Sequence, residues 1–157
     1  MKMQTPDKRS PEFVVLKSVE ISASPDAVWR TLTEPDRITK WMDGAHVEST
    51  WELGSDITFS GTMPNFNKKY RDRGTVLAVE RGKLLQYSHW SQMTRRPDLP
   101  QNRTILTFTL EPLGETTRLT LRQENFHSEV EYKHANFFWG VALHILKKWV
   151  EGEIDLP

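Results

Sequence analysis

The stretch EVEYKHANFFWGVALHILKKWVE, Glu129 to Glu151, repeats apolar side chains at helical spacing and contains no proline. Gly152 stands where a helix ends, and Lys147 and Lys148 place positive charge in the last turns, which the helix dipole favours. One broad face of the helical wheel is apolar and holds Ala135, Phe138, Trp139, Ala142, Ile145, Leu146 and Trp149. The sequence therefore predicts a long C-terminal helix that must bury this face.

A β-sheet is the only sizeable partner that the rest of the chain offers to this helix. Alternating apolar and polar residues predict seven strands, over 13–22, 46–51, 57–63, 73–80, 84–90, 103–111 and 117–124. Ser24 and Pro25 are typical of a helix start, and Pro35 begins a second short helix that ends at Gly44. We therefore expect an α+β fold, in which an antiparallel sheet wraps around the C-terminal helix and two short helices separate the first and second strands.

Composition narrows the class of protein. The 157 residues fit one domain over 12–157, preceded by a mobile tail over 1–11 that is polar and carries two prolines. Lys and Arg together number 21, as do Asp and Glu, so no overall positive charge favours nucleic acid. Cysteine is absent, which excludes disulfides and thiolate metal sites. We expect a cytoplasmic protein, because no apolar signal region and no membrane span is visible.

The lengths of the predicted connections locate the mouth of any pocket. In an antiparallel meander, successive connections alternate between the two ends of the sheet. The short turns ELGSD, ERGK and PLGET share one end, and the longer segments MPNFNKKYRD, SQMTRRPDLPQN and NFHSE share the other. Binding sites usually lie among longer loops, so we expect the mouth there. Basic residues near it either attract an anionic ligand or form an ordinary solvated surface, which is the commoner case: Lys68, Lys69, Arg71, Arg95, Arg96 and Arg103.

Six stretches in this order and spacing resemble a known superfamily: ISASPDAVWRTLTEPDRITKWM, WELGSDITFSG, YRDRGTVLAVERGKLLQYSHWS, PDLPQN, TRLTLRQEN and NFFWGVALHILKKWVEGE. The chain resembles the START-like helix-grip superfamily, also called SRPBCC, and more specifically the branch named after the activator of the heat-shock chaperone ATPase. The resemblance covers Val19 to Glu153. It implies a helix-grip fold with a cavity between the long helix and the concave sheet, and it implies no cofactor.

The cavity that the resemblance implies accepts a small hydrophobic or amphipathic molecule. If the strand phases are right, ten residues project toward it: Trp51, Phe59, Tyr87, His89, Phe108, Leu121, Gln123, Phe138, Trp139 and Ala142. Large inward aromatic residues also fill solid cores, so a packed interior is the alternative. The amide of Gln123 is expected either to orient a polar group of the ligand or to cap the start of the last helix.

Signals of catalysis and metal binding are weak. None of the five histidines has metal-pair spacing, and no nucleophile elbow, phosphate loop or dinucleotide fingerprint is present. His89 shares a face with Tyr87, so it is a candidate general acid or base. A buried histidine satisfied by a polar neighbour is the more common situation.

Three functions follow, in this order. The first is binding of a small hydrophobic or amphipathic ligand, with Tyr87, His89 and Gln123 orienting its polar end. The second is an enzyme of the polyketide cyclase or hydratase type, with His89 as general acid or base, and it ranks lower because the sequence does not support catalysis. The third is a chaperone-interaction module, which requires a filled interior and an exposed docking face. Phe137 and Val141 lie off the main apolar face of the helix and are candidates for a homodimer contact.

Overall fold

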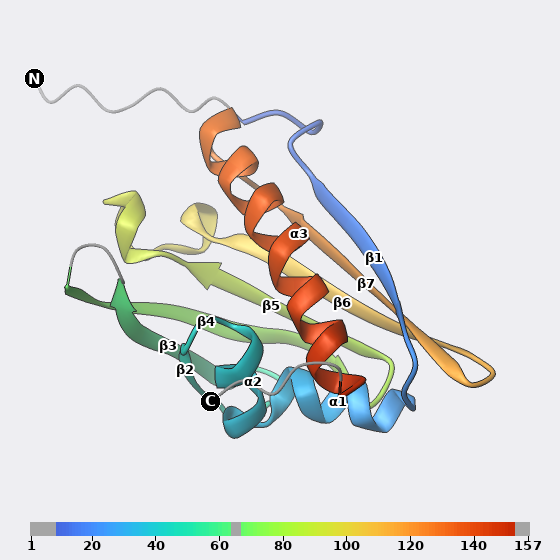
Figure 1. The fold of residues 1–157 in the computed structure, drawn as a ribbon. Helices are drawn as coiled ribbons and strands as arrows, with labels where there is room; N and C mark the ends of the chain where they lie inside the picture. The colour runs from blue at the N-terminus through green and yellow to red at the C-terminus, as the bar shows by residue number, and fades with distance from the viewer. Residues whose placement is uncertain (1–8, 64–66, 153–157) are drawn as a thin grey trace, which may run out of the picture.

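The computed structural model describes residues 9–63 and 67–152, and most of the predicted tail over 1–11 lies outside them. Within this part of the chain, seven strands form one antiparallel sheet in the order β1-β7-β6-β5-β4-β3-β2 (Figure 1). The elements are β1 (Val15–Ile21), α1 (Pro25–Thr33), α2 (Pro35–Trp41), β2 (His46–Glu48), β3 (Asp56–Met63), β4 (Lys68–Glu80), β5 (Leu84–Trp90), η1 (Gln92–Thr94), η2 (Pro100–Asn102), β6 (Thr104–Leu113), β7 (Thr116–Glu124) and α3 (Glu129–Val150).

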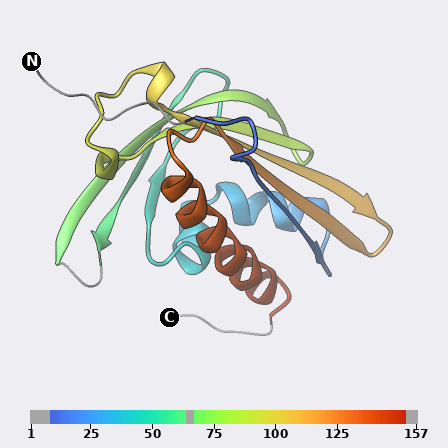
Figure 2. The same cartoon turned by 90° about the horizontal axis from the view of Figure 1, so that it is seen from above.

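The curvature of the sheet creates the interior of the protein. Seen from above, the strands arch over α3, and α1 and α2 lie beside the helix under the same arch (Figure 2). β1 pairs with β7, with Val15 opposite Gln123, so the first strand forms one edge of the sheet and β2 forms the other. The predicted α+β helix-grip fold, with two short helices between the first and second strands, is confirmed.

Local capping explains where the helices begin and end. Ser24 accepts a hydrogen bond from the backbone N–H of Ala27 at 3.2 Å, and Pro25 is the first residue of α1, as the sequence predicts. Ser128 performs the same role for α3, because its hydroxyl accepts from the N–H of Glu131 at 3.3 Å. Gly152 follows α3 with a φ of +75°, a conformation that glycine adopts without strain.

The buried face of α3 is rotated slightly from the predicted one. Trp139, Ala142 and Leu146 are buried as expected, but so is Leu143, which is 1% exposed, while Phe138 is 40% exposed. α3 packs against β1, α1 and α2, and Phe138 lines an open cavity, so the buried face differs from the one that the helical wheel predicts.

The largest differences in strand boundaries from the prediction concern β2 and β4. β2 ends at Glu48, three residues before Trp51, whose φ of +60° is outside the range of an extended strand. β4 begins at Lys68 and pairs with Met63, so MPNFNKKYRD is not a long loop. The sequence does not show an alternation of apolar and polar residues over the start of β4, because the inward residues Tyr70 and Asp72 are polar. The connections 91–103 and 125–128 lie at one end of the sheet, which we call the mouth end, but the 49–55 connection at the other end is longer than 125–128, so length alone does not separate the two ends.

Candidate functional site

A cavity of about 680 Å³ opens between the sheet and the N-terminal half of α3, at the mouth end. Strands β3 to β7 form its floor, and residues from the segment after α2, the 91–103 connection and the 125–128 segment form its sides. Its lining consists of Met42, Asp43, Ala45, Phe59, Thr62, Met63, Tyr70, Asp72, Tyr87, His89, Ser91, Met93, Thr94, Arg96, Asn102, Thr104, Leu106, Gln123, Phe126, His127, Glu131, His134, Ala135, Phe138 and Trp139.

Small residues in the floor make room for large aromatic ones. A Cβ atom on Gly61 would lie 2.8 Å from the hydroxyl oxygen of Tyr70, so the tyrosine can lie across β3 only because position 61 lacks a side chain. A Cβ atom on Gly74 would clash with the carbonyl oxygen of Ser88 and approach the ring of Phe59 to 3.4 Å. The two glycines therefore shape the wall of the cavity.

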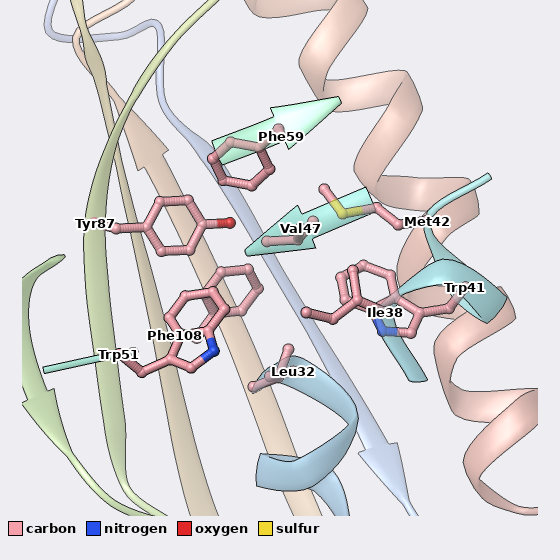
Figure 3. A pocket seen from close by; sticks show the side chains of 9 residues that line it. All are labelled: Leu32, Ile38, Trp41, Met42, Val47, Trp51, Phe59, Tyr87 and Phe108. Atoms are coloured by element: carbon pink, nitrogen blue, oxygen red, sulfur yellow. The ribbon is translucent and has the colours of Figure 1, made fainter. Parts of the chain in front are cut away.

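Tyr87 brings a polar group into this apolar interior. Its side chain projects from β5 into the interior, and its hydroxyl points toward the side on which Met42, another cavity-lining residue, lies (Figure 3). Tyr87 is 5% exposed, and its hydroxyl has no hydrogen-bond partner among the residues that the structure describes. Burial raises the pKa of the phenol, so it is neutral at physiological pH and can donate a hydrogen bond.

His89 has a carboxylate partner that the sequence analysis missed. The Nε2 atom of His89 lies 3.2 Å from Oδ2 of Asp72, and Oδ1 of the same carboxylate accepts from the backbone N–H of Gln92 at 3.0 Å. The ring also meets Phe59 edge-on, with centroids 5.0 Å apart. Extending the strand alternation back through Tyr70 would have placed Asp72 on the inward face beside His89.

Gln123 is fully engaged by protein groups. Its Oε1 atom accepts from Nε1 of Trp139 at 2.8 Å, and its Nε2 atom donates to the hydroxyl of Thr104 at 3.0 Å. The amide therefore holds the Trp139 ring in the wall of the cavity. Capping of α3 falls to Ser128 instead.

The structure brings six of the ten expected ligand-binding residues to the cavity: Phe59, Tyr87, His89, Gln123, Phe138 and Trp139. Trp51 and Phe108 instead border a space of only about 10 Å³ beneath α1 and α2, shown in Figure 3, where side chains meet in a solid core. Leu121 and Ala142 are buried and line neither space. The periodicity of strands and helices predicts which residues point inward. It does not predict which part of α3 packs in the solid core and which part borders the cavity.

An ion pair spans the mouth of the cavity. The guanidinium of Arg96 in the 91–103 connection donates to both carboxylate oxygens of Glu131 on α3, at 2.9 and 3.2 Å. Burial alone would raise the pKa of Glu131, but Arg96, together with the Ser128 hydroxyl, holds it below its ordinary value. Of the six basic residues expected near the mouth, Arg96 is the one in the cavity lining. Arg103 pairs with Asp98 and contacts Thr75 and Ser88.

A cluster of metal ligands and a membrane-spanning helix are two features not found among the described residues. They contain no group of three or more His, Cys, Asp or Glu side chains placed to hold a metal ion. Over the same ranges, no helix combines the length and the apolar character needed to cross a membrane.

Residues 22–151 match the family model described as Activator of Hsp90 ATPase homolog 1-like protein. A search of curated proteins found no match. Protein ChR145 from Cytophaga hutchinsonii has a similar solution structure, with 36% identity and a TM-score of 0.75 over 89% of this chain and 94% of the other.

Two further solved structures share the fold. Protein MLL2253 from Mesorhizobium loti is 26% identical, with a TM-score of 0.72 over 91% of this chain and 99% of the other. The structure described as the Aha1 dimer from Colwellia psychrerythraea is 23% identical, with a TM-score of 0.69 over 88% of this chain and 96% of the other. At this lower identity the likeness concerns the fold alone.

Proposed function

Because this chain belongs to the Activator of Hsp90 ATPase homolog 1-like family and has its helix-grip fold, we propose that it binds a small hydrophobic or amphipathic molecule in the cavity under α3. The observation that carries the proposal is a cavity of about 680 Å³, within the usual size range of small-molecule sites. A packed interior, the alternative from the sequence, would leave no such space.

The walls of the cavity suit an apolar ligand. Phe138 is 40% exposed although it belongs to the apolar face of α3, so an apolar molecule in the cavity would remove its ring from water. Met42, Met63 and Met93 line the same space, and methionine side chains adapt to ligands of different shapes. These residues support binding of a compact apolar body.

One polar group of the ligand is expected near Tyr87. No hydrogen bond joins the Tyr87 hydroxyl to another described residue, and no fully buried side-chain oxygen or nitrogen in those ranges lacks a partner, so the hydroxyl oxygen is open to the cavity. A ligand oxygen or nitrogen within reach would take the place of water there. The proposal therefore favours an amphipathic molecule over a pure hydrocarbon.

Calorimetric titration with 1-nonanol and 1-naphthol tests the proposal. We expect at least one of them to bind the native chain. We expect Ala135→Phe, which places a ring inside the cavity, to weaken that binding at least about tenfold. Val141→Phe is the matched control, since Val141 is an exposed α3 residue outside the lining, and it should bind like the native chain. The proposal fails if neither probe binds, or if Ala135→Phe binds as tightly as the native chain.

Acid–base catalysis of the polyketide cyclase or hydratase type is a second candidate, favoured by the Asp72–His89 pair. A carboxylate 3.2 Å from Nε2 would hold the proton there and leave Nδ1 as the basic atom. Incubation with a β-hydroxyacyl thioester tests for dehydration. Turnover that disappears in His89→Gln supports catalysis, and no turnover by the native chain rules out the hydratase reaction. The chaperone-interaction module is not proposed, because it required a filled interior.

Self-association through α3 is a separate proposal. Phe137 and Val141 are 76% and 46% exposed, and one structurally similar protein is described as a dimer. Sedimentation equilibrium of the native chain and of Phe137→Ser would detect a dimer that this surface holds together. A native chain that sediments as a monomer at high concentration contradicts the proposal.

A further inference from the structure

The charged groups that line the cavity do not balance. Asp43, Asp72 and Glu131 contribute carboxylates, whereas Arg96 is the one Lys or Arg among the described lining residues. Arg96 uses two guanidinium nitrogens on Glu131, at 2.9 and 3.2 Å, so this pair is close to neutral as a unit. The remaining carboxylates belong to Asp43 and Asp72, and Oδ2 of Asp72 lies 3.2 Å from Nε2 of His89, a neighbour that balances its charge only when the ring is protonated.

These two carboxylates act on the same wall of the cavity. Asp43 is the second residue after α2, Asp72 lies on β4, and Tyr70 is also on β4 with its ring across Gly61. Burial raises the pKa of Tyr70 first, and the charges of Asp72 and then Asp43 raise it further. Both carboxylates therefore act on the Tyr70 hydroxyl, and both line the cavity at this wall.

Aromatic rings and a free hydroxyl complete the surroundings. Phe59, Tyr87, Phe138 and Trp139 line the same cavity, and the faces of such rings attract cations. The Tyr87 hydroxyl, 5% exposed and without a hydrogen-bond partner in the described ranges, is directed into the interior. Its oxygen can accept a hydrogen bond from a ligand N–H group.

We infer that the cavity selects amphiphiles whose polar end is a protonated amine and discriminates against carboxylates. The inference rests on the proposed binding function and names the chemical class of its ligand. An ammonium group near the Asp43 and Asp72 carboxylates gains Coulomb attraction, while the apolar part of the ligand occupies the aromatic side of the cavity. A carboxylate would meet like charges, and the guanidinium that could bind it is already paired with Glu131. Arg9 lies outside the lining, and its guanidinium is held by Asn125 and His127.

Three probes of equal chain length separate charge from apolar burial: nonylamine, 1-nonanol and nonanoate, titrated calorimetrically at neutral pH and low salt. Nonylamine should bind at least about tenfold more tightly than 1-nonanol, and nonanoate more weakly than 1-nonanol. The preference for the amine should shrink at high salt, because Asp43 is exposed and its charge is screened.

A matched pair of variants locates the charge. Asp43→Asn keeps a residue that tolerates the local φ of +53°, and it should weaken nonylamine about threefold to tenfold without changing 1-nonanol. Asp36→Asn makes the same charge change at an exposed position of α2 outside the lining, and should alter neither probe.

The outcomes separate this inference from the proposed function. If 1-nonanol binds as tightly as nonylamine, the inference is overturned and the binding function stands. The inference is also overturned if Asp43→Asn weakens all three probes alike, or has no more effect than Asp36→Asn. If none of the probes binds, both the inference and the proposed function fail.

Discussion

Introducing a phenylalanine at two alanines of α3 distinguishes the open part of the interior from the packed part. Ala135 and Ala142 are seven residues apart on one helix, so their Cβ atoms point to nearly the same side. Ala135 lines the cavity of about 680 Å³, whereas Ala142 is 3% exposed and lines neither that cavity nor the small space near α1. The same substitution therefore meets empty space at one position and packed side chains at the other.

The two substitutions should change the free energy of unfolding differently: Ala135→Phe should not lower it, and Ala142→Phe should. A ring that enters the cavity and buries roughly 100 Å² of apolar surface, at about 25 cal/mol per Å², stabilises by up to about 2.5 kcal/mol. Lower helix propensity offsets roughly 0.5 kcal/mol of this, so Ala135→Phe should leave stability unchanged or raise it by up to about 2 kcal/mol. Ala142→Phe should lower it by about 1–3 kcal/mol, because overpacking forces neighbouring side chains apart.

Urea denaturation measures these changes. Bound molecules are first removed from the native chain and both variants, and unfolding is then monitored by circular dichroism. The native chain and both variants should unfold with the same dependence on urea, so that midpoints report stability alone. A loss of stability in Ala135→Phe as large as that in Ala142→Phe would refute the reasoning, because the mouth end would then be as tightly packed as the rest of the core.

Three other substitutions probe single contacts. Gln123→Leu leaves the indole N–H of Trp139 without its acceptor and should cost about 1–3 kcal/mol in urea unfolding; an unchanged midpoint contradicts this. Glu131→Gln removes the partner of Arg96. Because the folded pKa of Glu131 is lowered, the stability difference from the native chain should be complete above its ordinary value of 4.5, decrease below that value, and vanish once the pH has fallen through the lowered folded pKa. A difference that persists in strong acid would contradict the lowered pKa. Tyr87→Phe should change stability by less than about 0.5 kcal/mol but weaken 1-nonanol about twofold to tenfold, and a large loss of stability would show that the hydroxyl already has a partner.

The parts of the fold that depend on local chemistry were predictable from the sequence. Ser24 and Pro25 begin α1, and the apolar face of the last helix does bury Trp139 and Leu146 against the sheet. Caps and hydrophobic periodicity are properties of neighbouring residues, so no tertiary information is needed to recognise them.

Features set by tertiary contacts were not predictable in the same way. The start of β4 at Lys68 depends on pairing with β3, and its inward residues Tyr70 and Asp72 are polar because they face a cavity. A helical wheel also carries no information on position along the axis. It therefore could not say that Ala135 lies at open space while Ala142 lies in the packed core, where α2 and β1 meet the helix.

Native mass spectrometry of the purified chain tests most directly whether the cavity is a binding site. The account predicts that the native protein and Val141→Phe carry an additional noncovalent mass, either acquired in the cell or taken up from added nonylamine or 1-nonanol, and that Ala135→Phe carries none. A native protein that stays bare with every added probe, or an Ala135→Phe variant that retains the same mass, would contradict it.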